Sequence, residues 1–140
     1  MGVDYYRTGL LLWIAEVCRL GHQLEDAAGA VNEALALVEK SDERVWESEL
    51  HRLKGELLLL GPVRDEEQAE AELTRALGIA RGQQAKSLEL RAATSLARLW
   101  HGQGKRTEAR EVLAPVYGWF TEGFDTPDLL EAKALLAELS

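Results

Sequence analysis

One pattern of small and large residues recurs three times along the chain. A small residue is followed four positions later by a larger aliphatic one, and three positions after that by another small residue. The copies are Ala27, Val31, Ala34; Ala69, Leu73, Ala76; and Ala109, Leu113, Val116, with valine in the last small position. Offsets of four and three place each copy on one helix face. Small residues there let a second helix approach closely, so the pattern predicts helix pairs repeated at spacings of 42 and 40 residues.

Turn-forming residues divide the chain at intervals of about twenty residues. They are Gly21, Ser41 with Asp42, Gly61 with Pro62, Gly82, Gly102 with Gly104, and the segment 123–127. Between them the sequence is rich in Ala, Leu, Glu, Arg and Gln and poor in β-branched residues, which favours helix over strand. No segment alternates apolar and polar residues as a half-buried strand does. The sequence therefore predicts an all-α fold with helices over about 4–20, 24–40, 43–60, 65–82, 85–102, 106–121 and 127–139.

The first helices of the first and third pairs also match each other. Leu10, Trp13, Ile14, Val17 and Gly21 correspond to Ala93, Leu96, Ala97, Trp100 and Gly104 at a constant offset of 83 residues. The glycine is expected to end its helix in a left-handed conformation. The second pair leaves two registers open. Its apolar stripe is Trp46, Leu50, Leu53 and Leu57, but Gly55 suits the position of closest helix contact instead.

These pairs resemble tetratricopeptide repeats, whose second helix carries Ala, a larger residue and Ala at the same offsets, within a standard repeat of about 34 residues. Segments 49–57, 87–100, 104–110 and 117–129 resemble the C-terminal region of large bacterial predicted ATPases. In those proteins a class III nucleotidyl cyclase or DNA-binding domain and a STAND-type P-loop ATPase precede the repeats. The resemblance implies a right-handed α-solenoid of three helix pairs, about 4–42, 43–84 and 85–122. It also implies a capping helix over 127–139 and a fragment of a longer protein.

The two ends of the predicted array differ in polarity. Thr126, Pro127 and Asp128 suit the start of a helix. After them, Leu129, Leu130, Leu135, Leu136 and Leu139 are expected to cover the last repeat, while Glu131, Lys133 and Glu138 meet water. In contrast, residues 10–14 are apolar almost all round the first helix. We expect an upstream repeat to cover this face, and the isolated fragment to form a homodimer through it.

Charge and composition exclude several classes of partner. The formal net charge is −8, which argues against general nucleic-acid binding, although residues 71–110 form a basic belt of eight Lys or Arg against three acidic residues. The strongly apolar run at 9–15 is far too short to span a bilayer. A single cysteine, Cys18, excludes a disulfide framework and a Cys-rich zinc module. We expect a cytoplasmic protein with no membrane contact.

Motifs that carry catalysis are missing from the sequence. It has no GxxxxGK[ST] phosphate loop and no HExxH, and His22, His51 and His101 are widely separated. Cys18 has no neighbouring base, so a buried structural thiol is the favoured interpretation. We therefore expect no catalytic residue, metal or cofactor, and no enzyme activity in this chain. An aromatic box for a ligand could be formed by Trp100, Trp119, Phe120 and Phe124. The favoured interpretation is a repeat-core position for Trp100 and packing beneath the capping helix for the other three.

The family resemblance implies a concave groove lined by the first helix of each pair. Carried over to this sequence, its lining residues are Arg91, Thr94, Arg98 and His101 in pair three, His51 and Arg52 in pair two, and Thr8, Leu11, Ala15 and Cys18 in pair one. Arg91 and Arg98 are two helical turns apart and could bind carboxylates bidentately. The alternative is ion pairing with Glu89, Glu108 or Glu111.

The expected function is non-catalytic binding of a peptide, a helix or the parent's own ATPase domain, in a bacterial signalling or transcription-regulating protein. The alternatives are a small-molecule inducer-sensing domain and a structural oligomerisation segment. An enclosed pocket lined by convergent polar groups would favour the sensor.

Overall fold

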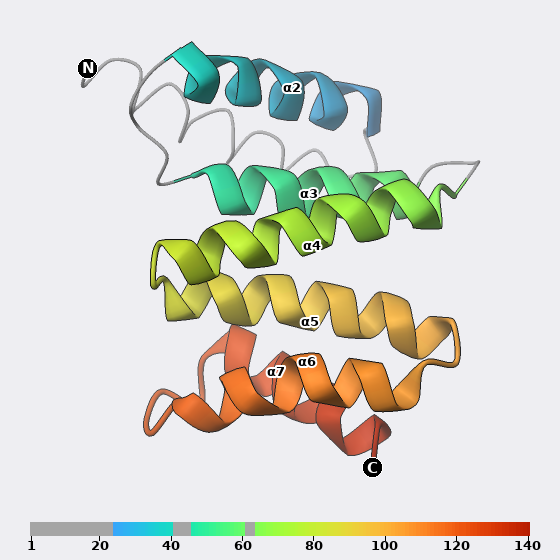
Figure 1. Cartoon of the computed structure of the whole chain (residues 1–140), viewed down its shortest axis with the longest axis vertical. Coiled ribbons are helices and arrows are strands. Elements are labelled where there is room, and N and C mark those ends of the chain that lie inside the picture. Colours follow the sequence, from blue (N-terminus) through green and yellow to red (C-terminus); the bar gives the residue numbers. More distant parts are fainter. Residues whose placement is uncertain (1–23, 41–45, 61–63) are drawn as a thin grey trace. The chain divides into compact units, whose positions relative to one another are not determined.

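The computed structural model describes residues 24–40, 46–60 and 64–140 (Figure 1). All regular structure in these residues is α-helical, so the predicted all-α class is confirmed for them. The helices are α2 (Leu24–Lys40), α3 (Glu47–Leu60), α4 (Glu66–Gly82), α5 (Lys86–Gly102), α6 (Arg106–Trp119) and α7 (Pro127–Glu138). Their bounds follow the predicted ranges closely. The helix expected near 4–20 lies outside the described residues, together with every expectation placed on it and on His22.

The chain forms two compact units, residues 1–76 and residues 77–140. The boundary falls inside α4, between Ala76 and Leu77. The helix itself runs through this boundary without a break, because Glu66–Gly82 is one continuous α-helix. Within the described residues, none of the helices has the length and apolar character needed to cross a membrane.

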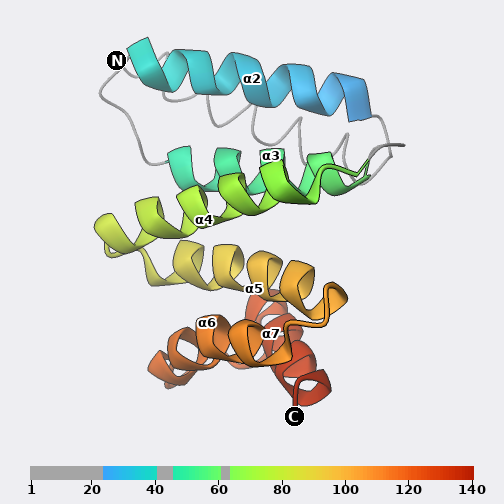
Figure 2. The same ribbon diagram turned by 45° about the vertical axis from the view of Figure 1, so that its right-hand side comes forward.

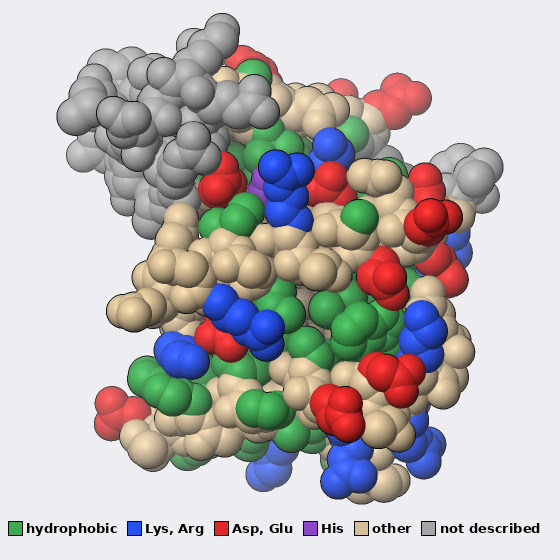
Figure 3. Space-filling model, in the orientation of Figure 1, with side chains coloured by type: hydrophobic (Ala, Val, Ile, Leu, Met, Phe, Trp, Pro, Cys, Tyr) green, Lys and Arg blue, Asp and Glu red, His purple; other side chains and the backbone are tan. Residues whose placement is uncertain are grey.

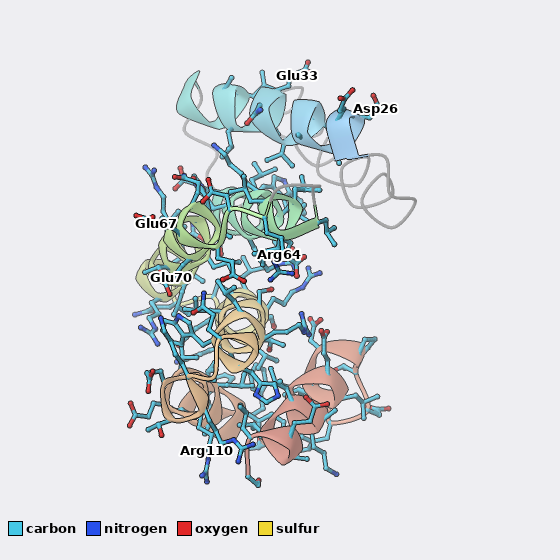
Figure 4. The ribbon with its side chains drawn as sticks, turned by 90° about the vertical axis from the view of Figure 1, so that its right-hand side faces the viewer. Asp26, Glu33, Arg64, Glu67, Glu70 and Arg110 are labelled. Atoms are coloured by element: carbon cyan, nitrogen blue, oxygen red, sulfur yellow. The ribbon has the colours of Figure 1, made fainter. Side chains whose placement is uncertain are left out.

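In the first unit, α3 uses two different faces for its two neighbours. Towards α2, Leu53 and Leu57 pack with Ala27 and Val31, and Leu50 packs with Ala34. On α2 the acidic side chains of Asp26 and Glu33 point away from α3 (Figure 4). The apolar stripe predicted for the second pair is therefore the face that meets α2.

The other face of α3 meets α4 at very short range. The Ser48 hydroxyl donates a hydrogen bond of 2.9 Å to the Ala76 carbonyl oxygen. A Cβ atom added to Gly55 would lie 2.9 Å from Leu73 Cγ and 3.2 Å from the Ala69 carbonyl oxygen. Gly55 is thus the position of closest approach, and the two registers left open by the sequence are two faces of the same helix.

In the second unit, α5 and α6 form an antiparallel hairpin, and α7 packs against both of them (Figures 1 and 2). The buried residues of α5 include Leu90, Ala93, Leu96 and Ala97, whereas Trp100 is half-buried. The buried residues of α7 are Leu129, Ala132 and Leu135, and its C-cap residue Leu139 is buried as well. Leu130 is 51% exposed, which corrects the expectation that it covers the last repeat. It lies one position outside the buried stripe of α7.

Successive turns of the second unit share one backbone motif. After α5, the Gly104 N–H donates to the His101 carbonyl at 3.1 Å and the Lys105 N–H donates to the Trp100 carbonyl at 2.8 Å. Gly104 has a φ of +80°, so the predicted left-handed glycine is confirmed. After α4 the same bonds run from Gln84 to Arg81 and from Ala85 to Ala80. There the left-handed residue is Gln84, with φ +55°.

The start of α7 differs from the expectation in one detail. Thr126 occupies the N-cap position and Pro127 the first turn, as predicted. The Thr126 hydroxyl makes no capping bond to the helix; it donates to the Gly123 carbonyl oxygen at 2.7 Å. It therefore stabilises the turn before the helix.

Candidate functional site

The two arginines and the histidine predicted to line a groove on α5 all lie beside acidic residues of α7. Arg91 Nε is 3.6 Å from Asp128 Oδ1, and Arg98 forms an ion pair with Glu131. His101 Nε2 is 3.7 Å from Glu138 Oε2. These partners differ from Glu89, Glu108 and Glu111, the ones that the sequence suggested. The side chains involved are 34% to 65% exposed, so each pair contributes less than about 1 kcal/mol.

Thr94 lies on the same helix but does not reach the surface. It is 5% exposed, and its hydroxyl donates to the Leu90 carbonyl oxygen at 2.8 Å. This bond satisfies the hydroxyl within its own helix. The row predicted on α5 is therefore two arginines and a histidine facing α7, with a buried threonine between the arginines.

His51, predicted as a groove residue of the second pair, is buried between α3 and α4. It is 8% exposed, and its Nδ1 is 2.7 Å from Glu72 Oε2. Because a carboxylate only accepts, Nδ1 carries the proton of this hydrogen bond. Glu72 Oε1 also lies 3.4 Å from the side-chain amide of Gln68 and 3.8 Å from Lys54 Nζ. His51 therefore helps to hold a buried carboxylate between the two helices.

Arg52, the other groove residue predicted in this pair, is 5% exposed. It binds Glu49 bidentately, with Nε and Nη2 at 2.9 and 3.0 Å from the two carboxylate oxygens, and its Nη1 is 2.9 Å from Glu56 Oε2. A buried guanidinium requires such partners because an unpaired charge away from water is costly. In the structure His51 and Arg52 belong to buried polar networks.

An open pocket of about 570 Å³ lies in the second unit, and of its lining residues only Trp119 was considered from the sequence as part of a possible ligand site. Its lining residues come from the end of α4, the α4–α5 turn, the first turn of α5 and the end of α6: Arg81, Gln84, Lys86, Glu89 and Trp119. Figure 3 shows basic side chains beside a hydrophobic patch over the left-hand ends of these helices.

The buried carboxylate of Glu89 pairs with both cations of this pocket. Glu89 is 7% exposed; its Oε2 is 3.3 Å from Arg81 Nε and its Oε1 is 3.2 Å from Lys86 Nζ. Lys86 Nζ also lies 5.6 Å from the centroid of the Trp119 ring. That distance is within the range of a cation–π contact.

The aromatic residues near α7 correct an expectation from the sequence. Trp119 is 57% exposed and Phe124 is 42% exposed, so neither is packed beneath the capping helix. The Trp119 ring meets Phe120 edge to face with centroids 5.2 Å apart, and Phe124 lies 5.9 Å from Tyr117. The sequence places an aromatic cluster here, but its pattern does not separate a core tryptophan from an exposed one.

Among the described residues, no three His, Cys, Asp or Glu side chains converge on a position that could hold a metal ion. The comparisons give no further guide, since no protein-family model, curated protein or solved structure matches this chain.

Proposed function

We propose that this chain is a tetratricopeptide-like right-handed α-solenoid segment that acts as a non-catalytic interaction module. Its binding partner is a peptide, a helix or the ATPase domain of its own parent, a bacterial signalling or transcription-regulating protein. The observation that carries the proposal is the burial of the repeated small–large–small positions.

All nine of these positions are at most 3% exposed: Ala27, Val31, Ala34, Ala69, Leu73, Ala76, Ala109, Leu113 and Val116. In each copy the three positions therefore form one helix face that is turned towards other helices. Alanine at the contact positions removes the bulk that normally separates helix axes, so neighbouring helices can pack closely. Helical repeat proteins are built in this way, with the same close-packed contact between helices recurring in every repeat.

The packing of α7 supports the same proposal. Its buried stripe of Leu129, Ala132, Leu135 and Leu139 lies against the α5–α6 hairpin, and its other side chains include exposed Glu131 and Lys133. A terminal helix with one apolar and one polar face is what closes an array of repeats. Along one edge, α7 also places Asp128 and Glu131 beside Arg91 and Arg98 of α5. The arginines of α5 therefore already bind one acidic helix, that of the chain itself.

A partner that binds Arg91 and Arg98 must compete with the carboxylates of α7 that already pair with them. We therefore expect an acidic partner segment. The direct test measures binding of the chain to the upstream region of its parent by isothermal titration calorimetry, for the wild type and for Arg91→Glu/Arg98→Glu. The expected result is at least tenfold weaker binding in the double variant.

The matched control is Arg106→Glu/Arg110→Glu, which makes the same charge change at two exposed arginines of α6. Arg110 points away from α5 (Figure 4). Circular dichroism establishes that both variants keep their helices. Equal binding by all three proteins would remove the α5 cations from the proposal, and no binding by the wild type would contradict an interaction with the parent's ATPase domain.

A further inference from the structure

We propose that the pocket beside Trp119 binds an acidic peptide segment, with a carboxylate held by Arg81 and Lys86 and an apolar side chain against Trp119. This inference rests on the proposed interaction function and names a second binding site, separate from the row of cations on α5. It assigns the pocket to one ligand chemistry: a carboxylate with an apolar group next to it.

The cations of the pocket have binding capacity beyond their bonds to Glu89. Arg81 uses Nε for Glu89, its side chain is 56% exposed, and its terminal amino groups make no further hydrogen bond within the described part of the chain. A guanidinium edge of this kind binds a carboxylate through two parallel hydrogen bonds. Lys86 adds a second positive charge, so two cations surround a single buried carboxylate and the pocket keeps a net positive charge.

Trp119 provides the apolar part of the site. At 57% it is the most exposed large hydrophobic side chain among the described residues. Phe120 packs edge to face against its ring and Lys86 lies over it, so contacts with two neighbours hold the indole in place. Arg81 and Trp119 line the same pocket. Tryptophan and arginine are enriched among the few residues that contribute most of the binding energy at protein interfaces.

The form of the pocket favours a peptide over a free small acid. Sites for small molecules enclose most of their ligand. Here Arg81 and Trp119, which would contact the ligand, are both more than half exposed. Such a surface suits a side chain that projects from a peptide backbone, with the remaining peptide lying outside the pocket.

The test is an NMR titration of the Trp119 indole N–H signal in the full chain. The probe is the acetylated and amidated peptide Leu-Glu-Glu-Leu, and its neutral counterpart is Leu-Gln-Gln-Leu. We expect saturable binding of the first peptide and at least tenfold weaker binding of the second. A third arm uses phenylacetate, a free acid with the same two chemical groups.

Two substitutions identify the site, and each has a matched control. Trp119→Ala and Arg81→Gln should each weaken binding at least tenfold; for Trp119→Ala the readout is the backbone amide signals around Gln84. Leu130→Ala and Arg110→Gln, which alter an exposed leucine of α7 and an exposed arginine of α6, should leave the affinity unchanged.

Equal affinity for the neutral peptide, or equal losses in the control variants, would overturn the inference. Tighter binding of phenylacetate than of the acidic peptide would also overturn it, in favour of a small-molecule site. The outcome is separable from the proposed function, because that is tested by the variants of Arg91 and Arg98. Those variants leave the residues of the pocket intact.

Discussion

Gln84 and Gly104 occupy equivalent positions in two successive helix–helix turns, but only one of them is a glycine. Both have positive φ, at +55° and +80°. A side chain in this region crowds the backbone, whereas glycine adopts it without steric cost. Helix α4 therefore ends in a strained conformation that α5 avoids.

We predict that Gln84→Gly raises the free energy of unfolding by about 0.5–1 kcal/mol, because relief of the left-handed strain exceeds the entropy cost of glycine in the unfolded chain. The converse change, Gly104→Gln, should lower it by about 1 kcal/mol. Urea unfolding followed by circular dichroism measures both. A loss of stability in Gln84→Gly would mean that the turn does not have the observed geometry.

Gly55 illustrates the opposite case, in which a glycine is required by packing. Alanine normally favours a helix over glycine by about 1 kcal/mol. An added Cβ at position 55 would lie 2.9 Å from Leu73 Cγ and 3.2 Å from the Ala69 carbonyl oxygen. Overpacking of this kind costs about 1–3 kcal/mol.

The net expectation for Gly55→Ala is a loss of about 1 kcal/mol in unfolding free energy, measured by urea titration. Gly29→Ala is the control, since Gly29 is also helical and an added Cβ there meets nothing within 4 Å. It should gain about 0.5–1 kcal/mol. If both substitutions stabilise the protein, α3 and α4 are not in close contact at Gly55.

At the scale of elements, α7 is attached to the α5–α6 hairpin by two kinds of interaction. One is the buried stripe that contains Leu135, 6% exposed, and Leu139, 0% exposed. The other is the edge of exposed ion pairs that includes Arg98 with Glu131. Burial of a leucine is worth more than an exposed ion pair, because water screens the charges and the pair must order two long side chains.

We therefore predict that Leu135→Ala destabilises the protein by about 2–4 kcal/mol. Arg98→Gln should cost about 1 kcal/mol or less. Hydrogen exchange of the α7 amides distinguishes detachment of this helix from global unfolding, and it should show the larger loss of protection for Leu135→Ala. The reverse order would show that the charge pairs, and not the leucine stripe, hold α7 in place.

At the scale of the whole molecule, α4 belongs to both compact units. Ala69, Leu73 and Ala76 are buried residues of the first unit, while Leu77 and Ala80 are buried residues of the second. The sequence has no linker at this boundary; Gly and Pro are absent between Glu66 and Leu77. The division therefore follows from which helices contact one another, and no change in amino-acid composition marks it in the sequence.

The sequence by itself determined the helices and the buried small–large–small positions on them. Helix periodicity and turn residues are local signals, so the bounds from α4 to α7 were predicted to within about two residues. All nine positions of the repeated small–large–small pattern were identified as well. It also identified Gly55 as a position of close contact, although it could not choose between the two faces of α3.

Only the tertiary structure decided which faces meet, and with them the character of the candidate site. His51 became a buried partner of Glu72 on α4, and Arg91 and Arg98 of α5 met acidic residues on α7. Trp119 came to lie at the surface beside Lys86. The physical reason is that these contacts join residues up to about forty positions apart through the angles at which helices cross, and no local pattern encodes those angles.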